Sequence, residues 1–390
     1  MTNRSHRLIS MTAGMALLAS AAIAVAQTPA AKPVATPVAA KPTPAATATP
    51  AKTTAWVAPG TPGSPIDGTI FHAQVLLDVA GFPTGVIDGQ KGMIFKKAVQ
   101  GYQQANNIPV TGELDGATRQ RLLQEQRPST RMFKLSADDV AGPFIDPMPK
   151  EPELQAKLPG MYYRNMLEKL AERFHTTPKT IVDLNGPDKS IGVGETLRLP
   201  NVLPRSRDYG KVDEKFGGLL NNFQVDAQQP QGDFVVVDKS DGVLRVYTGE
   251  IPTGPYSTDK ERGAPPTLSE TPGQLVAQFP VTMGSGHDPL PLGKWKATTY
   301  AFLPPFHYQP SLFWDAKDKG APEQTIPPGP NGPVGVAWLD LSKEHYGIHG
   351  TPSPETIGRA ESHGCIRMAN WDVIRLARIM KPGFTAIFQD

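Results

Sequence analysis

The residues best suited to chemistry are a single cysteine and the histidines near it. Cys365 is the only cysteine among 390 residues, so it cannot form an intramolecular disulfide. His363 lies two residues before it and His349 lies sixteen residues before it. A thiol is a useful nucleophile only as a thiolate, and a neighbouring imidazole both lowers its pKa, from about 8.5, and carries the proton to the leaving group. The pattern predicts acyl transfer through a cysteine nucleophile.

The glycine beside the cysteine fits the same chemistry. Gly364 places no side chain next to the sulfur, which lets a substrate carbonyl approach the backbone N–H groups there. Such N–H groups form an oxyanion hole, which stabilises the charge that develops on the carbonyl oxygen. The glycine therefore favours an oxyanion site next to the nucleophile.

This stretch resembles the catalytic motif of the YkuD-type L,D-transpeptidases, in which a histidine precedes Ser/Thr-His-Gly-Cys by a dozen or more residues. The resemblance covers residues 346–350, residues 362–367 and Asn370. Upstream, residues 283–284 with 291–295 resemble another family segment, with leucine at position 292 where threonine usually stands. The glycine-rich residues 332–335 resemble a further family element.

The resemblance implies roles for individual residues. Cys365 would be the nucleophile and His349 the general base. The remaining positions would shape the donor site or hold the oxyanion: Ser362, His363, Gly364, Arg367 and Gly350. The resemblance also implies a β-sandwich, no cofactor, no metal, and peptidoglycan stem peptides as acyl donor and acceptor.

Some of these residues have simpler interpretations. His363 could satisfy a turn, and Arg367 could be a structural ion-pair partner. We expect Asn370 to cap a helix over residues 371–380, because that segment has helical apolar spacing with an acid early and bases late. Pro382-Gly383 then ends the helix.

A zinc site is the alternative chemistry for the same stretch. Four side chains there carry N or S donors: His345, His349, His363 and Cys365. The four-residue spacing of the first two suits a metal best on a helix, where both share a face. Gly347 and residues 338–341 indicate a turn and a strand instead, so we favour acyl transfer.

The N-terminus predicts export. Arg4 and Arg7 precede an uncharged run, residues 8–26, that ends in Ala24-Val25-Ala26. A positive segment, an apolar segment and small residues at a cleavage point are typical of a signal peptide. We therefore expect residues 1–26 to be a signal peptide and the protein to reach the periplasm and its wall. An uncleaved anchor is the alternative, because the run approaches the length of a membrane span.

Residues 27–65 predict an extended linker. Their proline, alanine and threonine cannot form a packed core, and an extended chain of this kind could reach about 100 Å. A tether to the wall and an idle spacer fit equally. The formal net charge of +2 gives no reason to expect a nucleic acid as partner. We expect a monomer without a stable membrane span.

Residues 66–127 predict a small helical domain. Apolar spacing indicates helices around residues 71–79, 94–102 and 122–123. A Gly-x-x-Asp-Gly element occurs twice, and we expect its aspartates, Asp88 and Asp115, to cap the helices that follow. The segment resembles the peptidoglycan-binding PG_binding_1 fold, which implies contact with the wall.

Residues 161–203 resemble a degenerate LysM module with βααβ order. Residues 166–174 have the spacing of an amphipathic helix, Thr177-Pro178 begins a second helix that ends at Asn185, and residues 193–200 read as turn and strand. The usual Gly-Asp before the first helix is missing. A packing or spacer role is the alternative to glycan binding.

Residues 232–390 predict the catalytic domain. Short strands are expected at five places: 234–238, 243–247, 274–281, 294–300 and 334–339. The first two flank Lys239-Ser240-Asp241-Gly242, which is typical of a hairpin. Long loops at 254–272 and 304–330 could shape a site. Four aromatic residues are candidates for the cleft: Phe313, Trp314, Trp338 and Tyr346.

The sequence thus predicts a multidomain α+β chain: a helical bundle, a LysM-like module and a mainly-β catalytic domain. We expect an exported L,D-transpeptidase that works through a thioester acyl-enzyme. An L,D-carboxypeptidase or hydrolase with the same site is one alternative, and a non-catalytic peptidoglycan-binding protein is another. We also expect residues 205–390 to form the acyl-enzyme without the preceding regions.

Overall fold

The computed structural model describes residues 56–58, 61–62, 64–252, 273–359, 362 and 364–390. The predicted signal peptide, most of the predicted linker, the predicted loop at 254–272 and His363 lie outside the described residues. None of the helices in the described ranges is both long enough and apolar enough to cross a membrane.

The N-terminal helical region, residues 66–127, contains the helices that its apolar spacing predicts. They are α1 (Gly68–Val79), α2 (Met93–Ala105) and α3 (Gly116–Leu122), followed by the 3₁₀ turn η1 (Leu123–Glu125). Leu122 is buried, but Leu123 is 55% exposed, so only one residue of that predicted pair faces the core.

The two repeated aspartates behave differently. Asp115 directly precedes α3 and accepts a hydrogen bond from the Thr118 N–H at 2.9 Å, as predicted. The prediction for Asp88 is wrong, because α2 begins several residues later, after Gly92, without a side-chain cap. The Asp88 carboxylate accepts from the Gln90 N–H instead, at 2.8 Å, and stabilises the turn.

The α6–α7 region, residues 161–203, has the two predicted helices, α6 (Met166–Arg173) and α7 (Pro178–Asn185). Thr177 caps α7, with Pro178 at its first position. The strand β2 (Thr196–Pro200) pairs antiparallel with β1 (Thr130–Lys134). The first strand therefore comes from before the predicted segment, and the short helices α4 (Ala137–Val140) and α5 (Pro152–Gln155) occupy the intervening chain.

The C-terminal sheet region, residues 232–390, is built on a nine-stranded sheet in the described part of the chain, in the order β5-β4-β3-β13-β7-β10-β11-β12-β6. The strands are β3 (Phe234–Asp238), β4 (Val243–Thr248), β5 (Gln274–Pro280), β6 (Thr282–Met283), β7 (Gly293–Phe302), β10 (Ala337–Leu341), β11 (Gly347–His349), β12 (Ile366–Arg367) and β13 (Thr385–Gln389). Strands β5 and β6 lie at opposite edges although only Val281 separates them, so the sheet curls until its edges approach each other. Strands β3 and β4 form the predicted hairpin.

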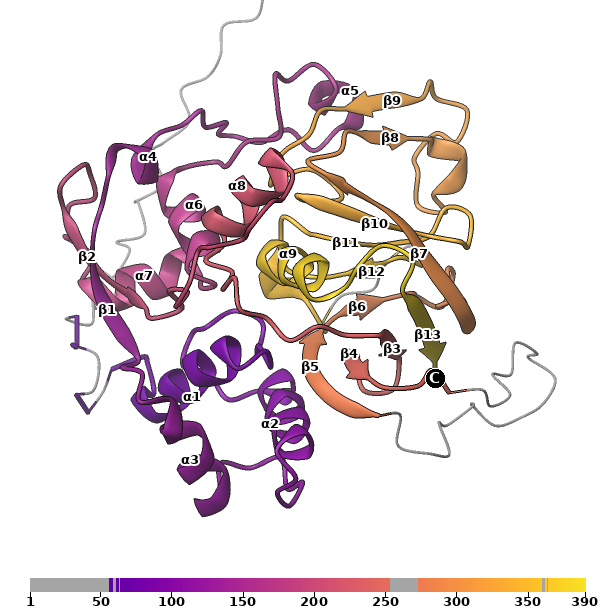
Figure 1. The fold of residues 1–390 in the computed structure, drawn as a ribbon. Helices are drawn as coiled ribbons and strands as arrows, with labels where there is room; N and C mark the ends of the chain where they lie inside the picture. Colours follow the sequence, from indigo (N-terminus) through magenta and orange to yellow (C-terminus); the bar gives the residue numbers. More distant parts are fainter. Residues whose placement is uncertain (1–55, 59–60, 63, 253–272, 360–361, 363) are drawn as a thin grey trace, which may run out of the picture. The chain divides into compact units, whose positions relative to one another are not determined.

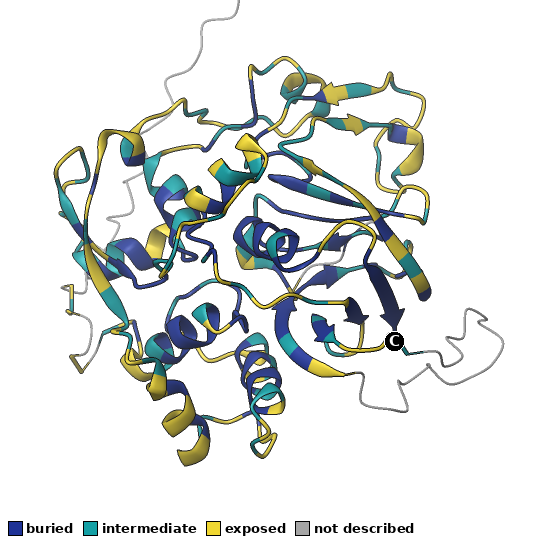
Figure 2. Cartoon of the chain, viewed as in Figure 1, coloured by how far each residue is buried: buried dark blue, intermediate teal, exposed yellow. Residues whose placement is uncertain are grey.

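Part of this sheet is covered on both faces. Its concave side encloses a core that includes α8 (Glu214–Asn222) and α9 (Asn370–Ile379). Its outer side, at β3, β4, β5 and β13, packs against α1 and α2 (Figure 1). Strand β3 is consequently buried along its whole length, which explains its unbroken apolar run (Figure 2).

The predicted long loop at 304–330 contains structure of its own. Strands β8 (Phe306–Tyr308) and β9 (Gln324–Ile326) pair antiparallel into a separate two-stranded sheet. The 3₁₀ turn η2 (Pro310–Leu312) lies between these strands, and a further 3₁₀ turn, η3 (Pro354–Thr356), lies between β11 and β12.

Candidate functional site

Two neighbouring strands bring the predicted nucleophile and base together. Strands β11 and β12 run parallel, with Ile348 opposite Ile366 and His349 opposite Arg367. Cys365 directly precedes β12, so the register places it beside the strand that ends in His349. Met283 of β6 pairs with Ile366 on the other side, which brings the upstream motif to the same site.

Cys365 is half-buried, and its thiol lies 3.7 Å from the His345 carbonyl oxygen, to which it donates. Burial raises the pKa of this thiol, while a hydrogen bond from the Gly347 N–H and the charge of Arg367 act weakly in the other direction. Burial outweighs them because a thiolate loses its hydration there. The resting thiol is therefore protonated at neutral pH, contrary to the expected lowering of its pKa.

His349 is held in one tautomer. Its Nδ1 lies 2.7 Å from the Gly350 carbonyl oxygen, and because a carbonyl only accepts, Nδ1 carries the proton. Nε2 is thus left as the basic atom. Burial and, to a lesser extent, the charge of Arg367 lower the pKa of the imidazole to about 3, although the hydrogen bond to Gly350 opposes them. Trp338 stacks on the ring, with centroids 5.4 Å apart.

The segment around the cysteine is shaped by Ser362 and Gly364. The Ser362 hydroxyl is buried and donates to the Cys365 carbonyl at 2.7 Å, while its N–H donates to the Gly284 carbonyl at 3.0 Å. Gly364 has φ +94°, and a Cβ there would lie 2.7 Å from the Tyr346 ring. Only glycine fits this position without strain.

Arg367 is the charged group of the site. It is half-buried, and burial lowers its pKa, while Cys365 acts in the opposite sense. Its charge disfavours protonation of His349 and favours the thiolate of Cys365.

The prediction that Asn370 caps α9 is wrong. The helix begins at Asn370 itself, after Ala369, which makes no side-chain cap. The Asn370 side chain is fully buried and accepts from the Val336 N–H at 3.2 Å. Gly350 packs against this amide, since a Cβ there would lie 2.2 Å from Asn370 Oδ1. Asn370 therefore links the loop before β10 to the residue that holds His349.

The zinc alternative gains no support within the described residues, which contain no group of three or more His, Cys, Asp or Glu able to hold a metal. His345 and His349 lie on a turn and a strand, as the sequence indicates. The His345 side chain is 60% exposed and pairs with Glu344 at 3.5 Å.

The aromatic candidates divide into two groups. Trp338 stacks on His349 and Tyr346 covers Gly364, so both border the site. Phe313 packs against aromatic residues of the β8–β9 hairpin. Trp314 is 46% exposed and stacks on His287, with centroids 4.3 Å apart.

Two family models match parts of the chain. Residues 232–388 match the L,D-transpeptidase catalytic domain, YkuD. Residues 69–122 match PG_binding_1, a peptidoglycan-binding domain. Neither match includes the α6–α7 region. Both agree with the resemblances that the motifs carry.

Short stretches are similar to curated proteins. One of 56 residues is 61% identical to the L,D-transpeptidase YkuD of Bacillus licheniformis, covering 14% of this chain and 34% of that protein. Another of 54 residues is 63% identical to YkuD of Bacillus subtilis, covering 14% and 33%. The chain thus spans about a third of the length of these relatives.

Solved structures of L,D-transpeptidases are also similar in part. One from Mycobacterium smegmatis gives a TM-score of 0.28 at 17% identity, covering 41% of this chain and 59% of that chain. One from Xylanimonas cellulosilytica gives 0.32 at 13% identity, covering 85% and 99%. TM-scores of this size do not establish a common fold.

Proposed function

We propose that this protein is an L,D-transpeptidase that acts on peptidoglycan stem peptides through Cys365. The observation that carries the proposal is the pairing of β11 with β12, which sets the thiol segment beside a histidine whose Nε2 is the free base. The match of residues 232–388 to the L,D-transpeptidase catalytic domain supports the substrate class.

In the first half-reaction, Cys365 Sγ attacks the carbonyl between the third and fourth stem residues. Because the resting thiol and imidazole are both neutral, the thiol proton moves to His349 Nε2 as the C–S bond forms. The N–H groups of Gly364 and Cys365 hold the oxyanion. His349 then protonates the leaving amine, the terminal D-amino acid departs, and a thioester remains.

In the second half-reaction, an amine of a neighbouring stem attacks the thioester. His349 accepts a proton from the attacking amine, the new amide forms, and the sulfur leaves and recovers its proton from His349. The positive charge of Arg367 stabilises the sulfur whenever it carries negative charge. Ser362 and Gly350 shape the backbone on either side, and His363 completes the donor site.

In this proposal the remaining regions bring the protein to the cell wall. Residues 1–26 direct export to the periplasm and residues 27–65 form the linker. Residues 66–127 contact the wall, and residues 161–203 form a LysM-like module, to which β1 contributes the missing first strand. The protein acts as a monomer, without cofactor or metal.

Incubation with a disaccharide-tetrapeptide, followed by mass spectrometry, tests the proposal. We expect loss of the terminal D-amino acid and formation of cross-linked dimers. Cys365→Ser should abolish both products, because the imidazole cannot ionise a hydroxyl of far higher pKa. Tripeptide without dimer would show that water resolves the thioester and would replace transpeptidase by carboxypeptidase. Recovery of the tetrapeptide unchanged would exclude both.

A further inference from the structure

A buried carboxyl group outside the sheet region reaches the site from helix α6. Glu172 is only 3% exposed, and its two carboxyl oxygens lie 3.0 and 3.1 Å from Asn370 Nδ2 at the start of α9. The Tyr163 hydroxyl lies 3.0 Å from one of these oxygens. Residues that are 198 positions apart in sequence are therefore joined directly.

The Asn370 amide has a partner for each of its polar groups. One hydrogen of Nδ2 is donated to Glu172 and the other to the Pro330 carbonyl at 3.1 Å, while Oδ1 accepts from the Val336 N–H. Acceptors face the nitrogen and a donor faces the oxygen, so the orientation of the amide is fixed. Loss of one partner leaves a buried donor unsatisfied.

From this amide the contacts continue to the proposed base. Oδ1 lies so close to two glycines that a Cβ at Gly335 would be 2.1 Å away and one at Gly350 would be 2.2 Å away. The Gly350 N–H donates to Ala337 at 3.2 Å, and its carbonyl accepts from His349 Nδ1 at 2.7 Å. The position of the Asn370 amide therefore limits where the Gly350 carbonyl can point.

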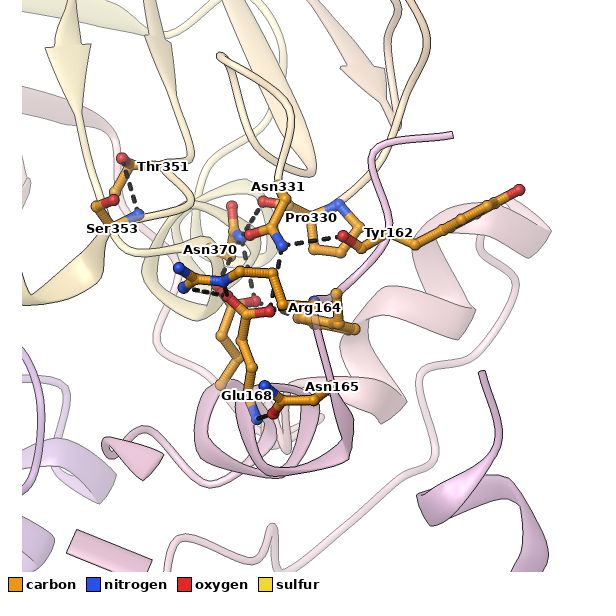
Figure 3. A network of polar contacts seen from close by, with 11 residues as sticks. Tyr162, Arg164, Asn165, Glu168, Pro330, Asn331, Thr351, Ser353 and Asn370 are labelled. Carbon is orange, nitrogen blue, oxygen red and sulfur yellow. Dashed lines mark hydrogen bonds and ion pairs between the residues drawn. The ribbon is translucent and has the colours of Figure 1, made fainter. Parts of the chain in front are cut away.

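The α6–α7 region also contacts the loop before β10, which carries Gly335. Asn331 Nδ2 donates to the Tyr162 carbonyl at 2.9 Å and to Glu168 at 3.2 Å (Figure 3). The Met161 N–H donates to the Pro328 carbonyl at 2.9 Å. The α6–α7 region thus contacts the loop before β10 at several points in addition to Glu172.

We propose that Glu172 is a positioning residue for His349: through Asn370 and the glycine pair at 335 and 350, it holds the carbonyl that selects the Nδ1–H tautomer. The proposal rests on the proposed function in that His349 acts as the base there. Without an acceptor at position 172, Asn370 loses one partner and the Gly350 carbonyl is less restrained. The Nε2–H tautomer of His349, in which Nε2 is no longer basic, then becomes populated.

The test uses the full chain and a graded series at one position. Glu172→Gln keeps an acceptor oxygen for Asn370, Glu172→Asp withdraws it by one methylene, and Glu172→Met keeps the volume without any acceptor. We expect the rate of Cys365 acylation by a β-lactam to stay near wild type in Glu172→Gln and to fall in Glu172→Asp. In Glu172→Met the rate should fall about tenfold to a hundredfold, the usual effect of misplacing a catalytic group.

Asp139→Ala is the matched control. Asp139 is also buried in an accessory helix, where it accepts from the Ser136 N–H at 2.8 Å, but it does not contact Asn370. It should lower stability and leave the acylation rate of the folded protein unchanged. An equal loss of rate in Asp139→Ala and Glu172→Met would reduce Glu172 to a structural role and overturn the proposal.

A second readout does not depend on activity. In protein with ¹⁵N-labelled histidine, the ring nitrogen shifts of His349, assigned with His349→Gln, report its tautomer. We expect Nδ1–H alone in wild type and Glu172→Gln, and a mixture in Glu172→Asp and Glu172→Met. A single Nδ1–H tautomer throughout would overturn the proposal. Absence of acylation in wild type, with the tautomers as expected, would instead count against the proposed function.

Discussion

The helical region and the α6–α7 region contact the C-terminal sheet region in different ways. The helical region covers the outer face of the sheet mainly with apolar side chains, such as Leu77 and Phe95 against Phe234 and Val236. Its polar contacts with the sheet region include the ion pairs of Asp78 with Arg375 and of Lys97 with Asp241. The α6–α7 region contacts helix α9 and the loop before β10 through buried polar groups, of which Glu172 is one.

The difference matters because the two kinds of contact constrain geometry differently. Apolar burial depends mainly on the area removed from water, so it stabilises the fold and tolerates small shifts. Buried hydrogen bonds are lost when donor and acceptor move apart or turn, so they fix position. The polar contact is also the one that reaches the residues around His349. We infer that the first contact supplies stability and the second supplies alignment.

The largest expected effect comes from removing both contacts. The sequence favours a fragment of residues 205–390 that keeps acyl-enzyme formation, but the structure argues against it. Truncation would expose the face of β3 that includes Phe234. It would also remove the carboxylate partner of Arg375 and one of the partners of Asn370. We expect the fragment to aggregate or to unfold without a cooperative transition, as measured by circular dichroism on heating. A cooperative transition at the temperature of the full chain would contradict the interpretation that these contacts stabilise the C-terminal sheet region.

The next effect concerns Asp78 of α1, which contacts both helix α9 and the α6–α7 region. Its carboxylate lies 2.9 Å from Arg375 of α9 and 3.0 Å from His175, and all three side chains are buried. Asp78→Ala leaves a buried cation unpaired, so the free energy of unfolding should fall by about 3–5 kcal/mol. Urea denaturation measures this change. Glu113→Ala, which breaks an exposed pair with Lys91, should leave the midpoint nearly unchanged.

The contribution of the Asp78 ion pair to stability should also depend on pH. Burial would raise the pKa of Asp78, but the charges of Arg375 and His175 outweigh it and hold that pKa below its usual value. A lowered folded-state pKa contributes stability above the unfolded pKa of about 4, and this contribution is lost as pH falls below it. Asp78→Ala should therefore lose less stability than wild type on acidification from pH 5 to pH 3.

The apolar contact gives the contrasting case. Leu77 is fully buried between α1 and the sheet, and Leu77→Ala should lower the free energy of unfolding by about 2–5 kcal/mol. At a temperature where the variant is folded, its acylation rate and the tautomer of His349 should match wild type. If Leu77→Ala changed the tautomer of His349 as much as is expected for Glu172→Met, the apolar and polar contacts would not differ in their effect on the site.

The sequence predicts the parts of the fold that have local patterns. Thr177-Pro178 sets the start of α7, and the hairpin of β3 and β4 follows from two apolar runs around a turn. Strands β11 and β12 are two or three residues long and too short to show a period, although they position His349 and Cys365. Strand β1 is mostly exposed and lies far before its partner, so nothing near it indicates pairing.

The candidate site divides in the same way. The motif itself identifies Cys365, His349 and the glycines that close contacts require. The sequence predicts Asn370 as the cap of the following helix, because asparagine before an apolar run usually caps a helix. Its true partners, Glu172 and Val336, are distant in sequence. Glu172 reads as part of the polar face of an amphipathic helix, since only the packing of α6 near α9 buries it.

The smallest expected effect is a change in how stability depends on pH. Burial raises the pKa of Glu172 to about 8, although hydrogen bonds from Asn370 and Tyr163 oppose it. A raised folded-state pKa gives stability that is present below the unfolded pKa and is lost as pH rises through about 8. For this shift the loss between pH 6 and pH 8 is about 2 kcal/mol. Glu172→Gln has no ionisable group, so it should remove that loss.

The measurement compares urea midpoints of wild type and Glu172→Gln at the two pH values. Glu113→Gln is the control, because hydrogen bonding to Lys91 lowers the pKa of Glu113 and keeps it ionised across the interval. The urea midpoint of Glu113→Gln should differ from that of wild type by the same amount at both pH values. If the midpoint difference between Glu172→Gln and wild type were also the same at both, Glu172 would not change its charge between pH 6 and pH 8. The polar contact would then have the same strength at both, and only its geometry would distinguish it from the apolar one.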